Sequence, residues 1–155
     1  MAHEKDIVFI KRTLEALRQY DQYKADLQQS YARTLFINSC IGLLIIPQSS
    51  QLLNNLSNEI ITKEKWGIDP RDIEVCTPKP TVKHIARHLR NAIGHNRFEC
   101  DCSLCISKPI EKITFNDIDI RNEKKVTFKA IIQFEDFRDF VLKVADHALT
   151  KMVEK

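Results

Sequence analysis

The longest apolar stretch of the chain, LFINSCIGLLII at residues 35–46, limits the folds that are open to it. Its 12 residues are interrupted by an asparagine, a serine and a glycine, whereas a membrane-spanning helix needs about 20 apolar residues. The stretch therefore predicts a buried central helix of a bundle, which begins near Asp26 and ends before Pro47. We expect its core-facing stripe to consist of Leu27, Tyr31, Leu35, Asn38, Ile41 and Ile45.

Helical periodicity recurs on both sides of this stretch. The chain has 155 residues but only three glycines, so tight hairpins should be few and a mostly helical fold is favoured. Its length fits a single domain, residues 1–155. Apolar residues spaced by three and four predict further helices at residues 5–20, at residues 49–60 after a serine cap, at residues 81–95 with Thr81 as the cap, and at residues 134–152.

The segments between these helices are less regular. The breakers WGIDPRD and TPKP predict a loop over residues 62–80, with one short helical turn after Asp69. KITFND and KKVTFKAII are rich in β-branched and aromatic residues and flank a polar turn, so they predict a small β-hairpin. The expected fold class is therefore mainly α, an up-and-down bundle of four to five helices with the hairpin before the C-terminal helix.

Composition and charge narrow the class of protein. The net charge is only +3, so a surface that binds a polyanion must come from local clustering of basic residues. The N-terminus MAHEKDIVFIKRTLEAL places charged residues between apolar ones at helical spacing, which does not predict a cleavable signal. Five cysteines is an odd number and is typical of reduced thiols. We therefore expect a cytoplasmic protein that does not interact with membranes.

The helix predicted at residues 81–95 has an unusual charge pattern. No acidic residue occurs at residues 75–98, although exposed helices usually mix the two signs because Glu–Lys pairs stabilise them. On a helical wheel, the core-facing stripe consists of Val82, Ile85, Ala86, Leu89, Ala92 and Ile93. The outward face consists of His84, His88, Asn91 and His95, with Lys83, Arg87 and Arg90 beside them.

Two kinds of site would use these aligned histidines. Zinc can take two imidazoles four residues apart, but the neighbouring arginines repel a cation and no carboxylate is near in the sequence, so we predict no metal. Phosphate fits the charges better, because arginine forms paired hydrogen bonds with it and imidazole transfers protons near neutral pH. Together these groups supply what cleavage of RNA through its own 2′-hydroxyl needs, without a cofactor.

The letters RNAIGH at residues 90–95 form an R-x4-H motif with a polar residue directly after the arginine. The motif lies near the end of a predicted helix, after the long apolar helix and before the hairpin and the closing helix. In this order the chain resembles the HEPN family, helical domains that include many ribonucleases of toxin–antitoxin, anti-phage and CRISPR systems. The specific letters of the resemblance lie at residues 88–98, and the order of elements extends it over most of the chain.

The resemblance implies a role for each residue of the motif. Arg90 and His95 would be the catalytic pair of a metal-independent endoribonuclease, with Asn91 as the supporting polar residue that orients His95. It also implies a homodimer in which two motifs meet across a two-fold interface. Arg90 and His95 lie about 140° apart on an ideal wheel, which fits a site completed by a partner. We expect the flanking Arg87, His88 and Arg97 to contact the RNA substrate.

We expect this endoribonuclease to act as a toxin or defence effector. Two alternatives to such an enzyme stay open. The first is a non-catalytic HEPN-like dimer that binds RNA, a nucleotide or an antitoxin protein, although the intact motif favours the enzyme. The second is a helical module with a zinc knuckle, since CDCSLC clusters Cys100, Cys102 and Cys105, with Cys76 as a candidate fourth ligand. Because zinc usually takes two separated cysteine pairs, we expect these cysteines to be reduced and metal-free.

Overall fold

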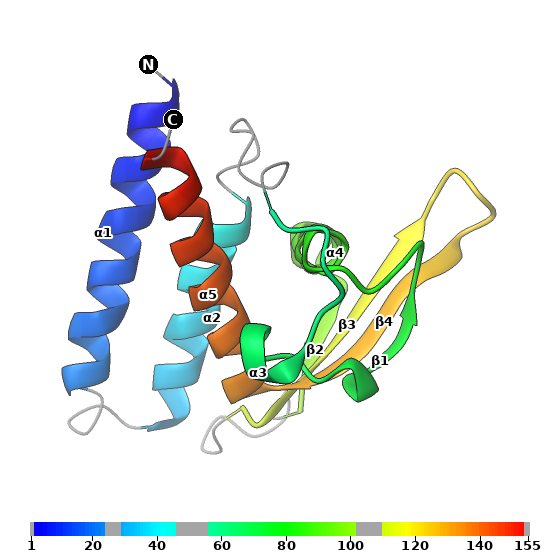
Figure 1. The fold of residues 1–155 in the computed structure, drawn as a ribbon. Coiled ribbons are helices and arrows are strands. Elements are labelled where there is room, and N and C mark those ends of the chain that lie inside the picture. The colour runs from blue at the N-terminus through cyan, green and yellow to red at the C-terminus, as the bar shows by residue number, and fades with distance from the viewer. Residues whose placement is uncertain (1, 24–28, 46–55, 102–109, 154–155) are drawn as a thin grey trace.

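The structure is a computed structural model that describes residues 2–23, 29–45, 56–101 and 110–153 (Figure 1). Helices α1 (Ala2–Tyr23), α2 (Gln29–Ile45) and α5 (Phe134–Val153) pack against one another on one side of the molecule. Helix α2 also contacts α4 (Val82–Gly94), so it lies between the other long helices and the second half of the fold. This arrangement confirms the central position predicted for the apolar helix.

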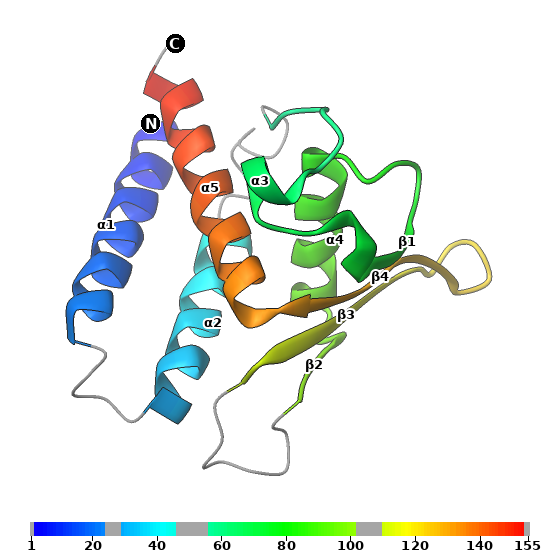
Figure 2. The same cartoon turned by 60° about the horizontal axis from the view of Figure 1, so that its bottom comes forward.

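The second half of the fold is an antiparallel sheet with α4 on one face (Figure 2). Its strands are β1 (Ile73–Cys76), β2 (Phe98–Cys100), β3 (Lys112–Asp119) and β4 (Lys125–Gln133), in the order β1-β4-β3-β2. Strand β4 leads directly into α5, which joins the sheet to the helical half.

The predicted fold class, a helical bundle with a small hairpin, is wrong. The hairpin of β3 and β4 is present, but it is the centre of a four-stranded sheet, because β1 pairs with β4 and β2 pairs with β3. The sequence missed the two edge strands because they have only four and three residues, too few to show an alternating pattern. The sheet provides the surface on which α4 packs.

Alternation along β3 and β4 decides which side chains face α4. The buried residues Ile113 and Phe115 alternate with partly exposed ones on β3, and Phe128 does the same on β4. They form the core with the apolar stripe predicted for α4, all of whose members are buried. The next position of the same alternation on β3 is Asp117, which is also buried at 5% exposure.

The helices predicted at residues 5–20, 81–95 and 134–152 are confirmed as α1, α4 and α5. The predicted stripe of α2 is wrong where the structure describes it, because Leu35 is 51% exposed and Asn38 is exposed. Among the residues of α2 whose burial is described, those that face the core are Phe36, Ile37, Cys40, Leu43 and Leu44. A helix that is apolar on almost every side gives no clear phase from its sequence. None of the described helices is long and apolar enough to cross a membrane.

The connection between α2 and α4 differs from the predicted third helix. Residues 46–55 of that prediction lie outside the described residues, and the described part is not helical, since Ile60 forms a β-bridge with Thr81. The predicted helical turn after Asp69 is confirmed as the 3-10 helix η3 (Pro70–Asp72), which Asp69 caps by accepting a hydrogen bond from the Arg71 N–H. A short helix, α3 (Lys63–Trp66), precedes it.

We expect Gly67→Ala to destabilise the protein by about 1–3 kcal/mol. Gly67 ends α3 at a φ of +92°, and a Cβ there would lie 2.7 Å from Asp139 Oδ2 and 3.0 Å from the Phe140 nitrogen. Chemical denaturation measures the change. The control is Gly94→Ala at the exposed end of α4, which should leave stability unchanged or raise it by up to about 1 kcal/mol. Equal effects at the two positions would contradict this account.

Candidate functional site

Helix α4 carries the predicted site, and a side-chain cap defines where it begins. The hydroxyl of Thr81 accepts a hydrogen bond from the His84 N–H at 3.3 Å, so the predicted cap is confirmed. His84 also places its ring nitrogen Nδ1 3.0 Å from the Lys79 carbonyl oxygen. These contacts attach the first turn of α4 to the segment that leads into it.

His88 lies on the buried side of α4, facing the sheet. It is 3% exposed, with Nδ1 2.8 Å from Asp117 Oδ2 and Nε2 2.9 Å from the Thr77 carbonyl oxygen. Its ring stacks on Phe128 at 5.1 Å between centroids. The predicted outward position of His88 is therefore wrong, and its use as an RNA contact is not supported by this geometry. On an ideal wheel His88 is only about 40° from Ala92, so it borders the core stripe.

The partners of His88 indicate the charge of its ring. A carboxylate oxygen and a carbonyl oxygen both accept hydrogen bonds, so each ring nitrogen must carry a hydrogen when Asp117 is ionised. Burial raises the pKa of Asp117, but hydrogen bonds from His88 and Asn91 outweigh it and hold the pKa below its ordinary value. His88 and Asp117 therefore form a buried ion pair.

Asn91 connects Arg90 with Asp117. Its side-chain oxygen accepts hydrogen bonds from Arg90 Nη2 at 2.9 Å and from Nε at 3.3 Å, and its side-chain nitrogen donates to Asp117 Oδ2 at 3.1 Å. A guanidinium only donates and a carboxylate only accepts, so these partners fix which way the amide points. The expected orientation of His95 by the Asn91 side chain is replaced by this bridge, while the His95 N–H donates to the Asn91 carbonyl oxygen at 3.0 Å.

Asp117 is the residue of this cluster that was not predicted from the sequence. The helix has no acid of its own, and the acid that pairs with its polar residues comes from β3 instead. One signal was available: in KITFND the aspartate follows the apolar Ile113 and Phe115 at the strand period of two. A carboxylate on the buried face of a strand requires a partner, which is a reason to search for one.

Arg90 is half-buried at the edge of the cluster. Burial lowers the pKa of its guanidinium and so does the nearby Arg87, whereas Asp117 opposes them by raising it. The hydrogen bonds to Asn91 use Nε and one hydrogen of Nη2, and within the described residues the guanidinium forms no other. The end of the guanidinium formed by Nη1 and Nη2 therefore keeps donors for an anion.

The other predicted site residues lie at the C-terminal end of α4 and on its surface. His95 is exposed and follows the last helical residue, and Arg87 is exposed. Arg97 donates a hydrogen bond through Nη1 to the Ile118 carbonyl oxygen at 3.3 Å and lies 3.9 Å from Asp117 Oδ1. The structure thus brings Arg90 and Asn91 together and directs Arg97 to the end of β3, while His95 and Arg87 remain open to solvent.

The described residues hold no cluster of three or more His, Cys, Asp or Glu side chains that suits a metal ion. Cys102 and Cys105 of the predicted cysteine cluster lie outside these residues. Cys76 places its sulfur 3.4 Å from the Lys79 carbonyl oxygen, and burial raises the pKa of its thiol to about 11.

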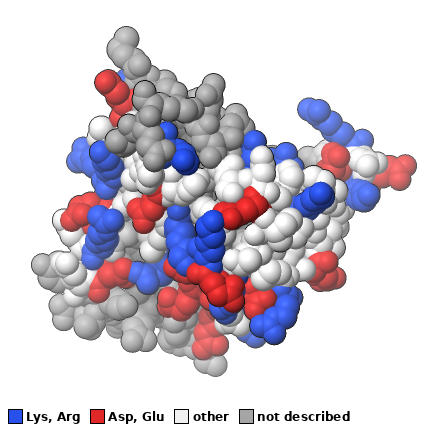
Figure 3. Space-filling view, viewed as in Figure 1, with Lys and Arg blue, Asp and Glu red and all other residues white. Residues whose placement is uncertain are grey.

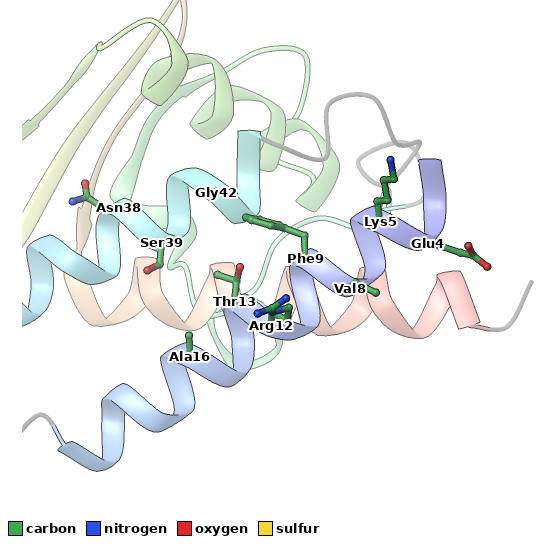
Figure 4. A pocket seen from close by; sticks show the side chains of 10 residues that line it. All are labelled: Glu4, Lys5, Val8, Phe9, Arg12, Thr13, Ala16, Asn38, Ser39 and Gly42. Atoms are coloured by element: carbon green, nitrogen blue, oxygen red, sulfur yellow. The ribbon is translucent and has the colours of Figure 1, made fainter. Parts of the chain in front are cut away.

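A groove of about 960 Å³ lies between α1 and α2, away from the motif (Figure 4). No predicted site residue lines it, and Val8, Phe9 and Ala16 supply part of its apolar surface. In the space-filling view, acidic and basic side chains are intermixed over the visible face, in keeping with the small net charge (Figure 3). Neither the groove nor the distribution of charge indicates a site elsewhere, so α4 remains the candidate site.

We expect His88→Ala to lower the free energy of unfolding by about 3–5 kcal/mol, because it leaves the buried Asp117 carboxylate without its charged partner. The matched control is His95→Ala on the exposed end of the same helix, which should change stability by no more than about 0.5 kcal/mol. Urea denaturation at pH 7 measures both. A small effect at His88 would mean that it is exposed, as the helical wheel first indicated.

Comparisons with known proteins identify the family. A family model described as HEPN pEK499 p136 matches residues 1–155. Comparisons with curated proteins and with solved structures gave no match. The resemblance drawn from the motif at residues 88–98 is therefore confirmed at the level of the family.

Proposed function

The chain belongs to the HEPN pEK499 p136 family, and from this membership we propose that it is a metal-independent endoribonuclease that acts as a toxin or anti-phage defence effector. Membership of the family fits a nuclease or another RNA-related role in general. The specific reaction proposed is cleavage of RNA by attack of its own 2′-hydroxyl on the adjacent phosphate.

One observation carries this proposal: the half-buried Arg90 is held by a side-chain amide while His95 is exposed at the end of the same helix. A fixed guanidinium with free donors suits a phosphate, and an accessible imidazole suits proton transfer. The absence of acids on α4 keeps carboxylates from pairing with these groups or repelling RNA.

In the proposed reaction, Arg90 stabilises the extra negative charge that develops on the scissile phosphate. His95 moves a proton, either from the attacking 2′-hydroxyl or to the leaving 5′-oxygen. The products are a 2′,3′-cyclic phosphate, or the phosphate formed by its hydrolysis, and a free 5′-hydroxyl. Arg87 is exposed beside Arg90 and would contact the RNA backbone.

Arg90→Ala and His95→Ala should each reduce the rate of RNA cleavage at least ~10²-fold, because each removes a group that acts in the transition state. Arg90→Lys should restore little, since an ammonium lacks the planar fork of donors. Gel assays on end-labelled RNA measure the rates. Arg12→Ala, a matched substitution of an exposed arginine on α1, should cleave like the parent.

The same assay tests the chemistry. Cleavage should continue in EDTA and fail on DNA and on 2′-O-methyl RNA. A requirement for a divalent metal, or a double Arg90→Ala/His95→Ala variant as fast as the parent, would refute the mechanism. A parent protein that binds RNA without cutting it would favour the alternative, a non-catalytic dimer that binds RNA, a nucleotide or an antitoxin.

We also expect a homodimer in which each site takes Arg90 from one protomer and His95 from its partner. Light scattering at micromolar concentration should report twice the monomer mass. Co-expressed Arg90→Ala and His95→Ala chains should then regain about a quarter of the parent activity, since half of the dimers are mixed and each mixed dimer has one complete site. A strict monomer that cleaves RNA would rule the composite site out.

A further inference from the structure

A continuous set of hydrogen bonds joins the proposed catalytic arginine to the buried face of the sheet. Arg90 donates to the Asn91 oxygen at 2.9 Å, and the Asn91 nitrogen donates to Asp117 Oδ2 at 3.1 Å. The same Asp117 oxygen accepts a hydrogen bond from His88 at 2.8 Å. Two of these side chains, His88 and Asp117, are almost fully buried, so the set runs from the core to the surface.

We propose that Asp117 is a positioning residue for Arg90, which it holds in place through the Asn91 amide; this inference rests on the proposed function. Asp117 touches neither the proposed substrate nor Arg90 directly in this arrangement. Its effect on the reaction passes through the orientation of one amide group.

Asp117 is buried and is held by contacts on the sheet as well as on α4. Its second oxygen, Oδ1, accepts the Ile118 N–H at 3.0 Å, and its backbone pairs with Phe128 of β4, just before a shift of register at Ile118. His88 in turn is held by the Thr77 carbonyl oxygen and stacks on Phe128. A long arginine side chain loses conformational entropy when it is ordered. A support that orders Arg90 in advance therefore reduces the entropy that is lost when the substrate binds.

The amide between Arg90 and Asp117 also has an electrostatic role. A carboxylate bonded directly to Arg90 would neutralise the guanidinium that the phosphate needs. Here the Asp117 charge is opposed by the buried His88, which donates a hydrogen bond to the same oxygen, and the neutral Asn91 stands between that pair and Arg90. Arg90 is thus oriented by an acid but keeps its own charge for the substrate.

A double-mutant cycle tests the route of the effect. Asp117→Asn should lower kcat at least about tenfold with little change in KM, because Arg90 acts in the transition state. In the Asn91→Ala background, the same change should alter kcat less than about twofold, because the link is already broken. The matched control, Asp69→Asn, changes another buried aspartate, bonded to Arg71, and should leave kcat unchanged. Effects of Asp117 and Asn91 that simply multiply would overturn the inference.

A second variant separates positioning from stability. His88→Phe/Asp117→Leu replaces the buried ion pair by apolar residues of similar size, a change that often preserves or raises stability. We expect this protein to melt near the temperature of the parent and yet to lose kcat as Asp117→Asn does. A folded double variant that cleaves at the parent rate would overturn the inference, as would loss of activity only in proportion to loss of folded protein.

A measurement that does not depend on activity completes the test. The ¹⁵N–¹H signals of Arg90 Nε and of the Asn91 side-chain amide report the bridge directly. Asp117→Asn or the apolar double variant should shift both signals, whereas Asp69→Asn should leave them in place. If the parent protein does not cleave RNA, the proposed function fails, but these signals still decide whether Asp117 positions Arg90. Unchanged signals in the Asp117 variants would refute the inference.

Discussion

The buried ion pair of His88 and Asp117 is the contact on which the arrangement of α4 and the sheet depends. A buried carboxylate is costly unless it is paired and hydrogen-bonded, and Asp117 meets both conditions through His88, Asn91 and its own strand. His88 reaches in a second direction to the Thr77 carbonyl oxygen, beside the end of β1. Together with the apolar stripe of α4, this imidazole sets the rotation of the helix about its axis, because it bonds both to β3 and to the residue that follows β1.

That rotation decides which side chains of α4 meet solvent. With His88 facing the sheet, Arg90 and Asn91 lie half-exposed at its edge, and Arg87 and His95 are exposed. The pattern explains why a helix without a single acid is stable against a sheet: its polar residues find their negative partner across the interface rather than along the helix. Intrahelical Glu–Lys pairs, the usual means of stabilising a surface helix, are not needed here.

The sequence predicted well the features that rest on local periodicity. The ends and core stripe of α4, the Thr81 cap and the hairpin of β3 and β4 follow from spacing and residue type, and the structure confirms them. The phase of α2 could not be predicted, because its apolar residues occur on almost every side. The edge strands β1 and β2 are too short to show a period, and only pairing with the hairpin makes them strands. The four-stranded sheet could therefore not be predicted from the sequence.

The candidate site likewise has a part that could be predicted from the sequence and a part that could not. The motif of Arg90, Asn91 and His95 is visible in the letters, whereas the inward turn of His88 depends on Asp117, 29 positions later in the chain. That contact has a consequence for the history of the family. Because Asp117 without His88 is a buried carboxylate that lacks its main partner, loss of His88 is tolerated best when Asp117 is replaced as well. In an alignment of family members, columns 88 and 117 should therefore covary. A lineage that replaced both residues by apolar ones would retain the fold, but its Arg90 would no longer be held in place and could be replaced in its turn.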